Sequence, residues 1–164
     1  MILGMTAFTF VHVVISLIGI LSGFVVVFGL FASKRLEGWT AIFLTSTVLT
    51  SVTGFFFPFH HLLPSHILGI LSLVVLAIAI PARYSFHLAG PWRRTYVITA
   101  VIAFYFNFFV LIVQSFQKVP ALQALAPKQS EPPFVIAQAA ALTLFVVFGV
   151  VAAMRFHTEK PLTA

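Results

Sequence analysis

The chain has 164 residues, of which 61% are hydrophobic and only 7% charged, and its mean hydropathy is +1.13. Soluble domains carry about 25% charged residues, so this composition excludes an ordinary soluble protein and predicts an integral membrane protein. The net charge of +6 comes without a basic stripe interleaved with aromatic side chains, so no nucleic-acid partner is expected. The lack of cysteine excludes disulfides, thiolate metal sites and covalent haem attachment.

Five apolar runs follow one another along the chain, each long enough to cross a hydrocarbon core of about 30 Å. The predicted spans are 7–31, 39–59, 62–81, 96–116 and 134–156. Lipid admits only helices or closed barrels as spanning structures, and no alternating barrel pattern is present. We therefore predict an all-α fold, a polytopic transmembrane helical bundle of about five spans in a single domain, residues 1–164. The third run is the shortest, because we expect it to end at Pro81.

The basic residues are distributed unevenly between the two predicted membrane faces. Seven fall on one face, namely Lys34, Arg35, Arg83, Arg93, Arg94, Arg155 and Lys160, and two on the other, Lys118 and Lys128. Because short loops rich in Lys and Arg stay in the cytoplasm, the N-terminus is predicted outside and the C-terminus in the cytoplasm. No basic residue precedes the first run and Lys34-Arg35 follows it, so a cleaved signal peptide is not expected.

Four of the six histidines are predicted to lie at one level of the membrane. The stretch "FFFPFHHLLPSH", residues 55–66, holds His60, His61 and His66 in the outer hairpin between the second and third spans. His12 lies about five residues into the first span, which places it within roughly 10 Å of the same surface. Imidazole serves as a haem or metal ligand, a proton carrier or a hydrogen-bond partner for a quinone, but also as an ordinary interfacial side chain.

Two different ligand sites can be built from these histidines. His12 and His66 are candidate cofactor-binding residues for haem b or a quinone, with Asn107 and Gln114 of the fourth span as further candidates. Alternatively His60, His61 and His66, with Glu131 as an oxygen ligand, are candidates for a metal site at the rim. Hydrogen bonding between helices is the competing explanation for Asn107 and Gln114.

Small and hydroxyl-bearing residues mark helix faces that we expect to pack closely. Gly19 and Gly23 form a small-xxx-small pair on the face that also carries His12. The second span has six hydroxyl residues within residues 45–53, which suit either helix packing or a polar path.

The sequence carries no recognisable catalytic constellation. It has no aspartate, its three glutamates are scattered, and no phosphate-binding glycine loop, zinc-protease motif or nucleophile elbow occurs. We therefore expect a non-enzymatic accessory or assembly component of a larger membrane complex, such as a respiratory one, with the lipid bilayer and other membrane subunits or a second copy as partners. A haem-, quinone- or metal-binding redox protein is the first alternative, and a small permease using the hydroxyl residues and Asn107 is the second.

Three segments, "FFPFHHLLPSHILGILSL", "ARYSFHLAGPWR" and "FNFFVLIVQSFQKVPALQALAPKQSEPPF", carry a resemblance that covers most of the chain. They resemble small uncharacterised multi-pass inner-membrane proteins of bacteria. The resemblance implies a location in the bacterial cytoplasmic membrane and no particular activity. With one histidine near the same end of two spans, the chain also faintly resembles haem-carrying helical bundles, through His12 and His66 alone.

Overall fold

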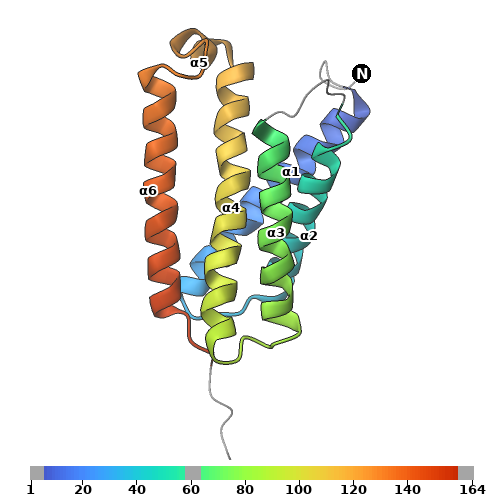
Figure 1. The fold of residues 1–164 in the computed structure, drawn as a ribbon, viewed down its shortest axis with the longest axis vertical. Helices are drawn as coiled ribbons and strands as arrows, with labels where there is room; N and C mark the ends of the chain where they lie inside the picture. The colour runs from blue at the N-terminus through green and yellow to red at the C-terminus, as the bar shows by residue number, and fades with distance from the viewer. Residues whose placement is uncertain (1–5, 58–63, 159–164) are drawn as a thin grey trace, which may run out of the picture.

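The structure is a computed structural model that describes residues 6–57 and 64–158. Within these residues the fold is all-helical. Six helices follow one another: α1 (Ala7–Phe31), α2 (Glu37–Gly54), α3 (Pro64–Tyr84), α4 (Pro91–Lys118), α5 (Pro120–Leu125) and α6 (Pro132–Arg155). The long helices alternate in direction, and α1 runs obliquely across the bundle to contact α2, α4 and α6 (Figure 1). The predicted all-α fold class is confirmed.

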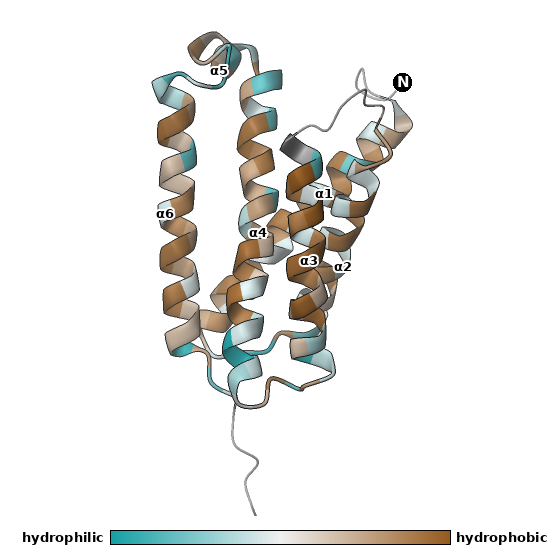
Figure 2. Ribbon diagram, viewed as in Figure 1, coloured by the Kyte–Doolittle hydropathy of each residue, from teal (hydrophilic) through white to brown (hydrophobic). Residues whose placement is uncertain are grey.

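Four of the described helices are long and apolar enough to cross a membrane: α1, α3 from His66 onward, α4 and α6. The 18-residue α2 is not among them, because hydroxyl side chains and Glu37 lower its hydropathy. Apolar residues occupy the lengths of the helices, and hydrophilic residues gather at the two ends of the bundle (Figure 2). The fold is therefore that expected of an integral membrane protein, with four candidate spans by length and composition.

Helix boundaries follow prolines and capping residues at most ends. Thr6 caps α1 by accepting a hydrogen bond from the backbone N–H of Thr9 at 3.2 Å. Helices α4, α5 and α6 each begin with proline in the first turn, where its missing N–H has no partner to lose.

The helix ends differ from the predicted span ends by three residues or more at three places. Helix α4 begins at Pro91, five residues before the predicted start of the fourth span at 96. The third helix continues through Pro81 to Tyr84, and the Pro81 carbonyl accepts from the N–H groups of Ser85 and Phe86 at 2.9 Å each. The second helix ends at Gly54 rather than near residue 59. Glycine is a poor helix former, and the N–H groups of Phe55 and Phe56 turn back to carbonyls three residues earlier.

Phe104 of α4 lies at the centre of the aromatic core. Its side chain is fully buried and its ring contacts Phe24, Phe43 and Phe145, with ring centroids 4.9, 5.9 and 4.8 Å apart. Helices α1, α2 and α6 therefore all pack on one residue of α4. Such edge-to-face aromatic contacts add about 0.5–1.5 kcal/mol per pair beyond the apolar area that they bury.

The end of the bundle where α1, α3 and α6 finish is the end that we predict to face the cytoplasm. There Arg83 is 3% exposed at its side chain, and its Nη2 lies 2.9 Å from Oε2 of Glu37. The same nitrogen donates to the carbonyl of Arg35 at 2.8 Å, and the guanidinium lies 5.2 Å from the ring centroid of Tyr96. This cluster ties the first loop and α2 to α3 and α4.

Candidate functional site

A cavity of about 550 Å³ lies among α1, α2, α3 and α4, toward the end of the bundle where α2 and α4 finish. This volume falls within the roughly 300–1,000 Å³ typical of small-molecule sites. Apolar side chains supply much of its wall, among them Val13, Leu17, Ile20, Leu68 and Val110. Unlike the aromatic core, the wall also carries polar groups from all four helices.

All four residues predicted to bind a cofactor line this cavity: His12 from α1, His66 from α3, and Asn107 and Gln114 from α4. His66 and Asn107 are buried, whereas His12 is half-buried and Gln114 is exposed. The structure thus brings four residues together around one cavity, although they are up to 102 positions apart in the sequence, from His12 to Gln114. That they bind a cofactor stays a prediction.

His12 is held between helices by its Nδ1 atom, which lies 2.7 Å from Oγ1 of Thr53. The Thr53 hydroxyl has one hydrogen, and its oxygen lies 2.6 Å from the carbonyl oxygen of Leu49, which can only accept. The Thr53 oxygen must therefore accept from His12, so Nδ1 carries the proton. In the neutral ring, Nε2 is then the hydrogen-bond acceptor.

The same argument from a hydroxyl hydrogen decides the orientation of the Asn107 side-chain amide. The Thr47 hydroxyl donates to the carbonyl of Phe43 at 2.7 Å, so its oxygen can only accept. Asn107 Nδ2 is the donor to that oxygen at 3.3 Å, which leaves Oδ1 of Asn107 as an acceptor.

Other polar atoms of the wall are already committed to their own helices. The hydroxyls of Ser16 and Ser115 donate to carbonyls four residues earlier, at 2.8 and 2.7 Å. Ser51 and Ser72 join α2 to α3, with their oxygens 3.1 Å apart. Thr50 differs, because its buried hydroxyl oxygen has no hydrogen-bond partner among the described residues.

The sequence did not single out Thr53, Thr50 or Ser72 as site residues. Thr50 and Thr53 belong to the hydroxyl-rich run of residues 45–53. In that run, the sequence does not distinguish residues that line the cavity from residues that only pack against other helices. Ser46, Thr47, Ser51 and Thr53 each donate to a carbonyl of their own helix, which favours helix packing over a polar path for most of the run.

The predicted metal site is divided between different parts of the chain. His60 and His61 lie outside the described residues, and His66 lines the cavity. The Glu131 carboxylate, in the loop before α6, accepts from the backbone N–H groups of Lys128 and Ser130 at 3.2 and 3.1 Å. Within residues 6–57 and 64–158 no three histidine or acidic side chains are grouped as metal ligands would be.

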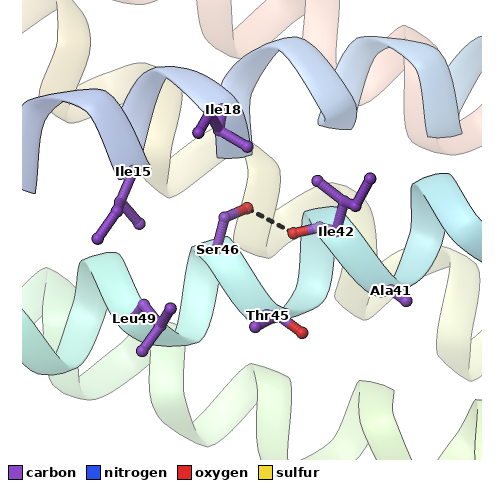
Figure 3. A pocket seen from close by; sticks show the side chains of 7 residues that line it. All are labelled: Ile15, Ile18, Ala41, Ile42, Thr45, Ser46 and Leu49. Atoms are coloured by element: carbon purple, nitrogen blue, oxygen red, sulfur yellow. Dashed lines mark hydrogen bonds between the residues drawn. The ribbon is translucent and has the colours of Figure 1, made fainter.

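A second hollow is a groove of about 390 Å³ between α1 and α2, lined by Ile15, Ile18, Ala41, Ile42, Thr45, Ser46 and Leu49 (Figure 3). Its wall is almost entirely apolar. Ser46 turns its hydroxyl to the carbonyl of Ile42 in its own helix at 2.7 Å, as the dashed line in Figure 3 shows. This groove therefore offers a ligand far less polar recognition than the cavity does.

The fold and the cavity together define a class: an all-helical bundle with four helices able to cross a membrane and a cavity with polar groups between them. Comparison with known proteins adds no closer assignment, because the chain matches no protein-family model, no curated protein and no solved structure.

Proposed function

We propose that this protein binds a neutral amphiphile of the quinone class, a ring with oxygen substituents and an apolar tail, in the cavity among α1 to α4. The observation that carries the proposal is the polar lining of that cavity in an otherwise apolar bundle. His12, Asn107 and Thr50 come from three different helices, and the hydroxyl oxygen of Thr50 is buried without a partner among the described residues. A buried polar atom in such a state calls for a ligand or water to satisfy it.

The chemistry of the wall suits a neutral ligand better than a charged one. No acidic side chain is among the described residues that line the cavity, so a cation would find no counter-charge. Lys118 is the charged residue of the lining and is exposed, near the end of α4. Aliphatic and aromatic side chains such as Val13, Leu17 and Phe106 supply much of the rest of the wall and suit a hydrocarbon tail.

We further propose a membrane arrangement of five spans with the N-terminus outside, in a bacterial cytoplasmic membrane. The support is that α2 returns the chain to the end where α1 begins, and that its hydroxyls bond within their own helix, which lowers the cost of placing them in lipid. The cavity then opens toward the outer leaflet. An accessory role beside other membrane subunits remains part of the proposal, because ligand binding between α1 and α4 leaves the outer face of α6 available to a partner.

The direct test is binding of a short-chain alkyl benzoquinone and its hydroquinone to purified protein in lipid nanodiscs, measured by calorimetry. Ser16→Phe should fill the cavity and abolish binding of both, because Ser16 lines it and is half-buried. Thr45→Phe is the matched control, since Thr45 lies on the exposed groove of Figure 3 and should leave binding unchanged.

A second variant covers the case in which Ser16→Phe fails to fold. Asn107→Leu keeps the branched shape of the side chain and should weaken binding while lowering stability only slightly, because hydrogen bonds between membrane helices contribute about 0.6 kcal/mol on average. An absorption spectrum of the same sample, oxidised and dithionite-reduced, tests haem b as the alternative ligand of His12 and His66. Absence of quinone and hydroquinone binding to the wild-type protein would refute the proposal.

A further inference from the structure

We infer that the cavity recognises the ligand through a hydroxyl group that donates a hydrogen bond to Nε2 of His12, so the hydroquinone binds more tightly than the quinone. This inference rests on the proposed function and adds the form of the ligand that the site selects. It depends on how the hydrogens of the surrounding hydroxyl groups are distributed.

Several polar groups in the inner part of the cavity wall are left as hydrogen-bond acceptors. Thr53 fixes the proton of His12 on Nδ1, and Thr47 fixes the amide of Asn107, so Nε2 and Oδ1 are left as acceptors. The oxygens of Ser16 and Ser115 are acceptors as well, because each hydroxyl hydrogen is given to a carbonyl of its own helix.

The inner wall also holds the second N–H of Asn107 Nδ2 and the imidazole of His66, and two further donors lie near the mouth. Gln114 and Lys118 are both exposed, in the last two turns of α4. Thr50 can either donate or accept. A quinone carbonyl, which only accepts, would bring an acceptor next to Nε2 of His12. A hydroquinone of nearly the same shape supplies the O–H that this nitrogen needs.

The position of His12 is also pre-organised for this contact. Its ring packs edge-on against Phe57, with centroids 5.0 Å apart, and its Cε1 would lie 3.9 Å from a Cβ atom placed on Gly54. With Nδ1 bonded to Thr53, the ring is held on two sides, so a ligand that bonds Nε2 has little side-chain entropy to overcome.

The experiment compares four probes in nanodiscs under anaerobic conditions: a short-chain alkyl hydroquinone, its quinone, its dimethyl ether and a fatty alcohol. The dimethyl ether has the ring and tail of the hydroquinone but no O–H. We expect the hydroquinone to bind roughly threefold to tenfold more tightly than the quinone and the ether, the ratio that one net hydrogen bond implies. A fatty alcohol that binds as tightly would identify an alkyl alcohol, rather than a hydroquinone, as the source of the hydroxyl.

Two variants locate the effect. His12→Phe keeps a ring but removes the acceptor, and should bind hydroquinone and quinone equally. Thr53→Val leaves His12 in place but frees its proton to move to Nε2, so the preference should fall or reverse. Thr45→Val, which removes a hydroxyl outside the cavity, is the control and should keep the preference.

Equal affinity of the wild-type protein for hydroquinone and quinone, or a preference that survives His12→Phe, would overturn this inference while leaving the proposed function intact. If none of the four probes binds, the proposed function itself fails.

Discussion

Gly23 of α1 and Phe104 of α4 meet so closely that a Cβ atom on Gly23 would lie 2.7 Å from Cδ2 of Phe104. Real Cβ contacts are not that short, so only glycine fits here without moving the ring. Gly19, one turn earlier, faces Ser46 and Asn107, where a Cβ would lie 3.2 and 3.3 Å from their side chains. The small-xxx-small pair predicted from the sequence is therefore the crossing point of α1 with α2 and α4.

Gly23→Ala is expected to destabilise the bundle by about 1–3 kcal/mol, the usual cost of overpacking a well-packed core. Thermal unfolding in detergent measures the effect. Gly149→Ala is the matched control, because its added methyl would sit at an ordinary 3.7 Å from Val101 and alanine favours the helix. Phe104→Leu alone should also lower stability, but in that background Gly23→Ala should cost less than in the wild-type protein. An equal cost in both backgrounds would show that the loss does not come from this contact.

Removing either partner of the ion pair between Arg83 and Glu37 should lower stability by different amounts. Glu37→Gln should lower stability by about 1–3 kcal/mol, because it leaves the buried guanidinium without its counter-charge, a cost reduced by the exposure of Glu37, 65% at its side chain. Arg83→Met should cost less, since it fills the space without burying a charge. Chemical denaturation compares the two, with Arg94→Met at the exposed control position. A larger loss in Arg83→Met would contradict this account.

Acid should loosen the loop before α6. Partial desolvation acts to raise the pKa of the Glu131 carboxyl, but its own backbone N–H and those of Ser130 and Lys128 outweigh this and lower the pKa below its ordinary value. A depressed folded-state pKa stabilises the loop above the unfolded-state pKa, and this contribution is lost as pH falls through the folded-state pKa.

Hydrogen exchange of residues 119–131 at neutral and acidic pH, corrected for the intrinsic rates, measures this change. Protection should fall at acidic pH in the wild-type protein. Glu131→Gln should show reduced protection already at neutral pH and little further loss in acid. Protection that is independent of pH in the wild-type protein would count against the role given to Glu131.

The membrane arrangement can be mapped with single cysteines, because the chain has none of its own. Lys34→Cys, Phe56→Cys and Ser130→Cys place a thiol at exposed positions after α1, after α2 and before α6. A membrane-impermeant maleimide added to intact cells should label positions 56 and 130 but not 34. If α2 does not cross the membrane, positions 34, 56 and 130 should all lie on one face, so all three would be labelled or none would be.

The sequence by itself indicated the long helices, because unbroken runs of some 20 apolar residues are stable in lipid as helices, and helix α1 covers the same residues as the first apolar run. It also singled out His12, His66, Asn107 and Gln114 as candidates, since polar side chains are conspicuous among apolar ones. Only the tertiary structure decided that these four share a cavity, that Thr53 bonds His12, and that Glu37 pairs with Arg83. In a soluble helix, alternation of polar and apolar residues reveals the buried face. Here the lipid-facing and buried faces are equally apolar, so the rotation of each helix, and every contact that depends on it, is set by packing at places such as Gly23 and Phe104.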